Sequence, residues 1–316
     1  MMISDIEKLH RTVKQGMIAV MGEMPGDEKR MSAEVCVEHS EELPHFTRQL
    51  ISFNTEPNDR IEAYLLLPNQ PKVLSGKTPA MLCLHQTTLE QKNEPAGVSG
   101  LPNLYYAAHL AERGYITLAP DYSLGQNFQK PGKVLFDLYS NGYASASMKG
   151  IWNHKICLDL LQSMPQVNAD HLGVIGHSLG GHNSLFLAAF DERVKVIVSS
   201  CGFTKFAKYM SGDLDAWSHS GYMPRVKSTF NCDPAQMPFD FPEIIASLVP
   251  RAFFTNSPLS DSNFDPGGVR ECIDFARPFY EELGVAEKLQ AIYPDCGHDF
   301  PNAARTAAYD FIDRWI

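Results

Sequence analysis

Residues 171–182 read His-Leu-Gly-Val-Ile-Gly-His-Ser-Leu-Gly-Gly-His, and the rest of the chain can be understood from this segment. The apolar run 172–175 leads into Gly176-His177-Ser178-Leu179-Gly180, and a helical pattern follows over 183–190. A turn of the form Gly-x-Ser-x-Gly between a strand and a helix is so tight that both outer positions must lack a side chain. It presents the serine oxygen at a helix N-terminus, where free N–H groups favour developing negative charge. The motif therefore indicates that Ser178 is a nucleophile.

The composition is that of an ordinary globular protein. The chain has 316 residues, 44% hydrophobic and 20% charged, which suffices for one large α/β domain. A formal net charge of −10 argues against binding to nucleic acid or to an anionic membrane. We find no apolar run of the length that a signal peptide or a membrane span requires. The 7 cysteines are odd in number and scattered, so we expect reduced thiols and a cytoplasmic location.

The first part of the chain predicts a helix followed by strands. Apolar residues recur at helical spacing over 3–21, which indicates an amphipathic helix. In the first strand-like run, Ala33, Val35 and Val37 alternate with polar residues. We expect antiparallel opening strands at 33–38, 46–53 and 60–67.

From residue 79 onward, predicted strands alternate with predicted helices. The strands cover 80–84, 115–119, 172–175, 194–199, 251–255 and 289–293. The helices cover 102–113, 144–163, 183–190, 268–283 and 302–316. This alternation is typical of a mostly parallel, doubly wound sheet with right-handed crossovers. We therefore expect residues 1–316 to form a single α/β domain.

Two long segments interrupt this alternation, and both begin where a strand ends. They cover 123–143 and 203–248. The carboxyl ends of strands are where open α/β sheets bind ligands. The second segment is rich in aromatic residues, so we expect a small cap over 203–248 that lines an acyl or alcohol pocket. The alternative is a packed surface segment that does not contact substrate.

A serine needs an adjacent base, and with this type of turn the acid and the histidine follow the serine in chain order. His298 follows the last predicted strand and a glycine, so it is the expected general base. The loop after 251–255 offers two acids, of which Asp261 is favoured and Asp265 is expected to cap the next helix. The loop after 194–199 reads Ser-Cys-Gly-Phe and offers no acid. Three other histidines near the site are expected to be structural, namely His85, His177 and His182.

The oxyanion of an acyl-transfer reaction needs two N–H donors. The first is expected to be the backbone amide of Leu179, directly after the nucleophile. The second should come from the loop after 80–84, which reads His85-Gln86-Thr87-Thr88 and contains no glycine. We expect the amide of Gln86 to serve, with Thr87 as the alternative.

These motifs resemble those of the α/β-hydrolase superfamily. The segments 59–68, 82–87 and 119–122, together with Cys-Gly-His-Asp-Phe-Pro at 296–301, look like bacterial esterases of the dienelactone-hydrolase and acetylxylan-esterase-like group. The resemblance covers roughly residues 30–316. Dienelactone hydrolases use cysteine as the nucleophile where this chain has Ser178, which favours simple esters over lactones.

The resemblance implies an α/β-hydrolase fold and a serine esterase that acts on small acyl or acetyl esters through an acyl-enzyme. Its triad would be Ser178, Asp261 and His298, with no cofactor and no metal. The pocket is expected to include His85, Thr87, Tyr122, Trp217 and Tyr222. The expected partner is a small-molecule ester, and the sequence is compatible with a homo-oligomer. Two alternatives stay open: another acyl hydrolase on the same triad (a peptidase, thioesterase or lactonase) and a non-catalytic binding protein.

Overall fold

The computed structural model describes residues 3–122 and 136–316. In this part of the chain one nine-stranded sheet has the order β1-β2-β3-β5-β4-β6-β7-β8-β9. The strands that pair antiparallel are β1 (Cys36–Glu42), β2 (Phe46–Glu56) and β3 (Asp59–Pro68), and β3 also pairs antiparallel with β5. The parallel strands are β4 (Thr78–Leu84), β5 (Ile116–Pro120), β6 (Val167–His177), β7 (Val194–Ser200), β8 (Ala252–Asn256) and β9 (Leu289–Ile292). The predicted fold class is confirmed.

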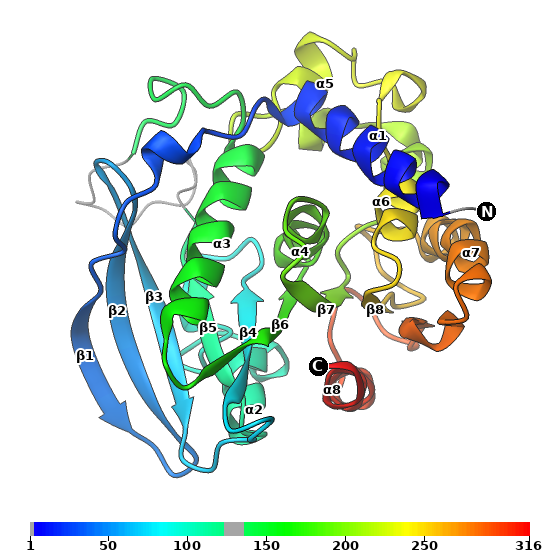
Figure 1. The fold of residues 1–316 in the computed structure, drawn as a ribbon. Coiled ribbons are helices and arrows are strands. Elements are labelled where there is room, and N and C mark those ends of the chain that lie inside the picture. Colours follow the sequence, from blue (N-terminus) through cyan, green and yellow to red (C-terminus); the bar gives the residue numbers. More distant parts are fainter. Residues whose placement is uncertain (1–2, 123–135) are drawn as a thin grey trace.

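Helices cover both faces of the sheet and bury a separate apolar core on each (Figure 1). One face carries α1 (Ile3–Met21), α3 (Ala146–Ser163), α4 (Leu179–Phe190), α6 (Phe241–Ser247) and α7 (Pro266–Glu282). The other face carries α2 (Tyr106–Glu112) and α8 (Asn302–Trp315). Strands covered on both faces have no polar side, which explains why β4 and β8 are buried throughout.

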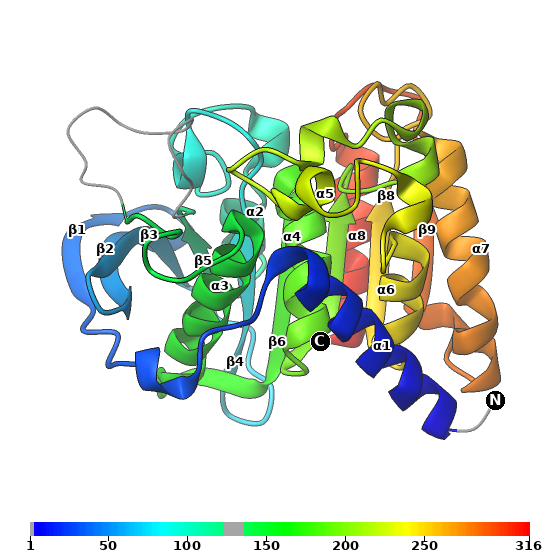
Figure 2. The same ribbon diagram turned by 90° about the horizontal axis from the view of Figure 1, so that it is seen from above.

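The N-terminal helix is part of this packing. α1 buries Val13, Met17 and Val20, which lie at helical spacing, and it lies across α4 and α6 (Figure 2). The apolar face that the sequence pattern predicts is therefore used against the other helices. Among the described residues, no helix is both long and apolar enough to cross a membrane.

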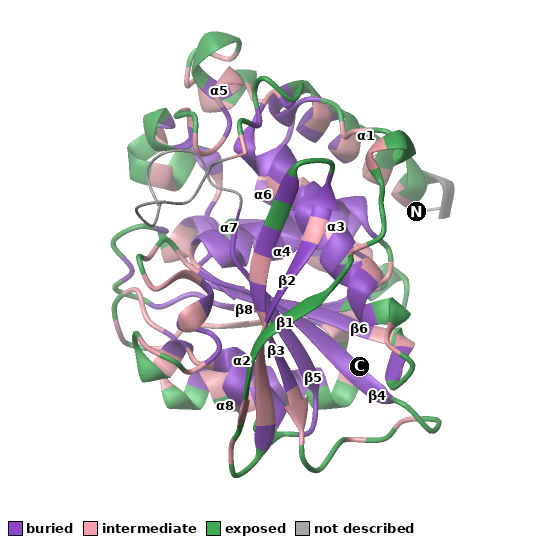
Figure 3. Cartoon of the chain, turned by 90° about the vertical axis from the view of Figure 1, so that its left-hand side faces the viewer, coloured by how far each residue is buried: buried purple, intermediate pink, exposed green. Residues whose placement is uncertain are grey.

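The predicted start of the first strand is wrong by three residues, and the strand lies at the exposed edge of the sheet. β1 begins at Cys36, three residues later than expected, and Val35 and Val37 are 43% and 56% exposed. β1 is the edge of the sheet, and Figure 3 shows it exposed along its length. Alternating apolar residues indicate an extended chain, but they cannot show whether another layer covers it. Charged side chains on this strand, such as Glu38 and Glu41, discourage pairing with another edge.

The segment 203–248 folds as a series of short helices between β7 and β8. They are η5 (Phe206–Gly212), η6 (Asp215–Trp217), α5 (Arg225–Ser228), η7 (Pro234–Gln236) and α6. Phe206, Trp217 and Phe241 are almost fully buried and join the core that contains α4. Of the other long segment, 123–143, residues 123–135 lie outside the described part.

Candidate active site

The turn between β6 and α4 has the strained geometry that the motif predicts. Ser178 adopts φ 53° and ψ −117°, a conformation that side-chain-bearing residues rarely take. A Cβ on Gly176 would overlap the backbone of Gly180, and a Cβ on Gly180 would overlap the carbonyl oxygen of Leu84. Both glycines are therefore required by close backbone contacts. The second contact also places the end of β4 directly against the first turn of α4.

An acid and a histidine meet at the same edge of the sheet. The Nδ1 atom of His298, in the loop after β9, lies 3.0 Å and 2.9 Å from the two carboxylate oxygens of Asp261, in the loop after β8. Asp261 also accepts hydrogen bonds from the amides of Asn263 and Phe264, at 2.8 Å and 3.2 Å. Asp265 instead accepts from the amide of Gly268 and caps α7. The structure thus separates the two candidate acids: one contacts the histidine and the other ends a helix.

The environment of Asp261 keeps its carboxylate charged. Burial alone would raise its pKa, but the hydrogen bond and charge of His298, together with the amides of Asn263 and Phe264, lower the pKa below the usual value. A charged Asp261 requires a proton on Nδ1 of His298, since a carboxylate only accepts hydrogen bonds. The other ring nitrogen, Nε2, is then left free to accept a proton.

Two buried side chains pack around this pair. His177, at the end of β6, lies edge-on to His298 with ring centroids 4.8 Å apart, and its Nδ1 contacts the hydroxyl of Ser200 at 2.9 Å. Burial, followed by the charge of His298, lowers the pKa of His177 to about 3, so this ring stays neutral. Cys201, directly after β7, donates its thiol to the carbonyl oxygen of Asp299 at 3.3 Å.

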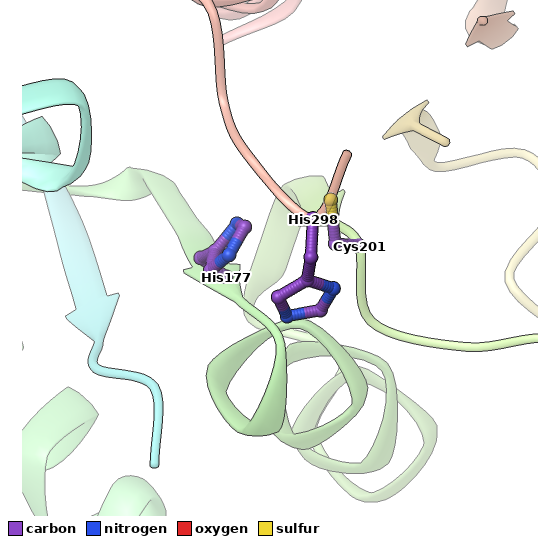
Figure 4. A group of neighbouring side chains, drawn as sticks. All are labelled: His177, Cys201 and His298. Atoms are coloured by element: carbon purple, nitrogen blue, oxygen red, sulfur yellow. The ribbon is translucent and has the colours of Figure 1, made fainter. Parts of the chain in front are cut away.

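Figure 4 shows His177, Cys201 and His298 together, and they are the one set of described side chains whose arrangement suggests a metal site. Their ligand atoms lie within 4.8 Å of one another. However, His298 uses Nδ1 to bind Asp261, and burial, with the nearby Asp261 charge, raises the pKa of the Cys201 thiol. A metal would need the thiolate form. The contacts therefore fit packing around the acid–histidine pair better than metal binding.

The loop after β4 is held in place by the side chain of Tyr122. The hydroxyl of Tyr122 donates to the carbonyl oxygen of His85 at 2.8 Å, and the two rings pack against each other at a tilt of 35°, with centroids 4.1 Å apart. Next in the chain, the side chain of Gln86 donates to Glu94 at 2.9 Å. These contacts fix the backbone of residues 85 and 86 beside the Ser178 turn, where we expect the second oxyanion donor.

A buried lysine with two carboxylate partners fixes a later part of the same loop. Lys92, which is 2% exposed, contacts Asp121 at 2.7 Å and Glu62 at 2.9 Å through its ammonium group. The backbone amide of Lys92 also donates to Asp121. Although burial lowers the pKa of Lys92, these two carboxylates raise it by more, so Lys92 stays charged. The loop is thereby tied to the end of β5 and to β3.

A pocket of about 290 Å³ opens beside Ser178. Its walls come from the loop after β4, the first turn of α4, the cap and the loop after β8. The described lining residues are Thr87, Ser178, Leu179, His182, Tyr209, Ala216, Trp217, His219, Tyr222, Asn263 and Phe264.

This pocket contains three of the five predicted lining residues, and it also includes His182, which was assigned another role. Thr87, Trp217 and Tyr222 border it as expected. His85 and Tyr122 do not, because both side chains are buried and pack against each other. His182 was expected to be structural, yet it borders the pocket. The only sequence signal for it was its position one helical turn after Ser178.

Comparisons with known proteins agree with this geometry. The family model described as "Glucuronyl esterase, fungi" matches residues 107–284, more than half of the chain and the part that contains Ser178 and Asp261. This chain belongs to the glucuronyl esterase family. It is accordingly a carboxylic ester hydrolase, and the predicted resemblance to α/β-hydrolase esterases is confirmed, although the motifs pointed to the dienelactone-hydrolase and acetylxylan-esterase-like group.

Similar proteins extend this match to the whole chain. A putative hydrolase, YtaP, of Bacillus subtilis is 24% identical over 310 residues, which cover 96% of this chain and 98% of that protein. Among solved structures, a glucuronoyl esterase from Solibacter usitatus superposes with a TM-score of 0.76 at 17% identity, covering 98% of this chain and 92% of that one. An acetyl xylan esterase from Paenibacillus sp. R4 gives 0.63 at 18% identity, covering 99% and 95%. At these identities, the solved structures establish the fold alone.

Proposed function

We propose that this member of the glucuronyl esterase family is a serine esterase for small carbohydrate esters, with Ser178 as nucleophile, His298 as general base and Asp261 as the acid. The observation that carries the proposal is the Asp261–His298 hydrogen bond, at the carboxyl ends of two strands in the same parallel sheet whose strand β6 ends at the Ser178 turn. A strained serine, a histidine and a buried carboxylate in this order suit nucleophilic acyl transfer.

In this mechanism Nε2 of His298 accepts the Ser178 proton as the serine oxygen attacks the ester carbonyl. Asp261 holds the ring in the required tautomer and stabilises the imidazolium that forms. The amides of Leu179 and Gln86 are the proposed donors to the tetrahedral oxyanion. His298 then gives the proton to the departing alcohol, which leaves an acyl-enzyme, and a water activated by His298 releases the acid.

The substrate class follows from the family and from the pocket. The described pocket lining carries no Lys, Arg, Asp or Glu, and it combines aromatic rings with hydroxyl, amide and imidazole groups. Such a lining suits a neutral, polar ring better than a long alkyl chain or an anion. We therefore propose esters of sugar acids, such as methyl glucuronate, and acetylated sugars as substrates.

The test combines labelling with turnover. A fluorophosphonate should label the wild-type protein on Ser178, and Ser178→Ala should abolish both labelling and hydrolysis of methyl glucuronate and of p-nitrophenyl acetate. Across p-nitrophenyl esters from acetate to decanoate, the rate should fall with chain length. Absence of both labelling and ester turnover in a folded protein would contradict the proposal.

A further inference from the structure

Two residues that line the pocket beside Ser178 each carry a buried nitrogen atom without a hydrogen-bond partner among the residues that the structure describes. One is Nε2 of His182, whose side chain is in the first turn of α4, and the other is Nε1 of Trp217, in η6 of the cap. The two residues are 2% and 3% exposed, and both border the pocket. Their ring centroids are 4.8 Å apart. Buried polar atoms in folded proteins normally have partners, so this pair needs an explanation.

The hydrogen-bonding character of each atom is fixed by the structure. Nδ1 of His182 lies 3.1 Å from the carbonyl oxygen of Gly202, which only accepts, so Nδ1 carries the ring proton. In a neutral ring Nε2 is then a bare acceptor. Burial lowers the pKa of His182 to about 3, which keeps the ring neutral at ordinary pH. The indole nitrogen of Trp217 can only donate.

An acceptor and a donor on neighbouring rings complement a group that both donates and accepts. A hydroxyl has this property, whereas a carboxylate or phosphate can only accept and an ammonium can only donate. The absence of charged side chains from the described lining also disfavours ionic groups. Tyr222, whose ring lies 5.8 Å from that of His182 and 5.9 Å from that of Trp217, supplies an aromatic wall on the same side.

We propose that His182 and Trp217 form a hydroxyl-binding subsite that selects esters bearing a hydroxyl on the part that enters the pocket. A substrate hydroxyl donates to Nε2 of His182 and accepts from the Trp217 indole. The inference rests on the proposed serine esterase function and adds the basis of its substrate choice. A site built to bond a hydroxyl discriminates strongly against an analogue that lacks it, because its own polar groups are then left buried and unpaired.

The test compares two methyl esters with the same leaving group: methyl glucuronate, which carries ring hydroxyls, and methyl cyclohexanecarboxylate, which carries none. The wild-type protein should favour the hydroxylated ester by roughly a hundredfold or more in kcat/KM. His182→Asn removes the acceptor but keeps an amide that can donate to Gly202, and it should lower this preference about tenfold. Trp217→Phe removes only the N–H donor and should lower the preference in the same direction.

The matched control is His219→Asn, at the exposed rim of the same pocket, where Nδ1 accepts from the backbone amide of Gly221. It should leave the preference between the two esters unchanged. Equal kcat/KM for both esters in the wild type, or an unchanged preference in both His182→Asn and Trp217→Phe, would overturn the subsite. If His182→Asn does not fold, Trp217→Phe decides alone.

The experiments distinguish a failure of the hydroxyl subsite from a failure of the esterase function. A protein that is labelled on Ser178 and hydrolyses both esters equally well retains the esterase function and contradicts only the hydroxyl subsite. A folded protein that is neither labelled nor active on either ester contradicts the esterase function itself.

Discussion

At the scale of single residues, the two acids in the loop after β8 show how contacts assign roles. Asp261 binds the ring of His298, and Asp265 binds the amide of Gly268. Asp261→Asn should lower kcat by roughly 10³–10⁴-fold, because an amide that donates to His298 favours the wrong tautomer. Asp265→Asn should keep nearly full activity, since asparagine is also a good helix cap. Steady-state kinetics on methyl glucuronate would check this. A larger loss of kcat in Asp265→Asn than in Asp261→Asn would mean that Asp265 is the acid of the triad.

The tight turn at Ser178 makes a second residue-scale prediction. Gly180→Ala should prevent folding or abolish activity, because the added methyl group would overlap the carbonyl oxygen of Leu84. Gly150→Ala is the matched control: it lies inside α3, and the nearest atom to its added Cβ is 3.9 Å away. It should stabilise the protein by about 0.5–1 kcal/mol. Urea unfolding with circular dichroism would measure both, and a stable, active Gly180→Ala would show that the turn can relax.

Sequence reasoning reached these residues because each has a local signal. The Gly-x-Ser-x-Gly turn, the histidine after the last strand and the acid after β8 can be placed by counting along the chain. The role of His182 could not be found in this way. Its neighbours in the pocket, Trp217 and Tyr222, follow it by more than thirty residues, and their approach depends on how the cap packs on α4.

At the scale of elements, the loop after β4 is held by contacts with the end of β5. Tyr122→Phe would remove the hydrogen bond to the carbonyl oxygen of His85 and loosen the backbone that carries the Gln86 amide. We expect kcat to fall about tenfold with little change in KM. This loss is smaller than the one that follows complete removal of an oxyanion donor, because the Gln86 amide is displaced and not deleted.

Tyr115→Phe is the control for that variant. It removes a comparable hydrogen bond, from the Tyr115 hydroxyl to Asp313 at 2.6 Å, at the opposite end of β5. Its thermal stability should fall by a similar amount, whereas kcat should not change. An equal loss of kcat in both variants would mean that Tyr122 acts only through stability.

The elements themselves were mostly predictable because their signals are local. Buried parallel strands appear as short apolar runs, and the surrounding helices as apolar residues at helical spacing. The position of β1 was not predictable in this way. Val35 and Val37 alternate with polar residues like a half-buried strand, but none of the helices in the described part of the chain covers that edge of the sheet, and both side chains are exposed.

At the scale of the whole molecule, the site depends on the strand order. β6, β7, β8 and β9 are successive neighbours, and they are followed by Ser178, Cys201, Asp261 and His298 respectively. The alternation of strands and helices predicts a parallel sheet, but it does not give the order of the strands within it. The meeting of Asp261 and His298 could therefore be expected only from the resemblance to α/β-hydrolases.

Three buried histidines make the stability of the whole fold sensitive to acid. Burial is the main cause that lowers the pKa values of His154, His177 and His182 to about 3, whereas an exposed histidine has a pKa near 6.5. Between pH 6.5 and about 3 these three side chains together bind up to three more protons in the unfolded chain than in the folded one, so they make acid favour unfolding. Their contribution lowers the free energy of unfolding by up to about 4 kcal/mol per pH unit in this range. Asp240, whose pKa burial raises to about 7, opposes them by up to one proton below that pH.

Urea titrations at several pH values would measure this slope. His182→Asn removes one of these groups and should make the slope shallower by up to about 1.4 kcal/mol per pH unit. The same slope in wild type and variant, or a stability that does not change between pH 7 and pH 5, would contradict the conclusion that these histidines are neutral in the folded protein.

Every residue of α4, from Leu179 to Phe190, is buried. Its backbone amides should therefore be among the slowest in the molecule to exchange with deuterium, and those of the short cap helices much faster. A protein organised in this way can change its cap without disturbing the turn that holds the nucleophile. Over evolutionary time, such a separation would let the accepted ester diverge through positions such as Trp217 and Tyr222, while the helix behind Ser178 tolerates almost no substitution.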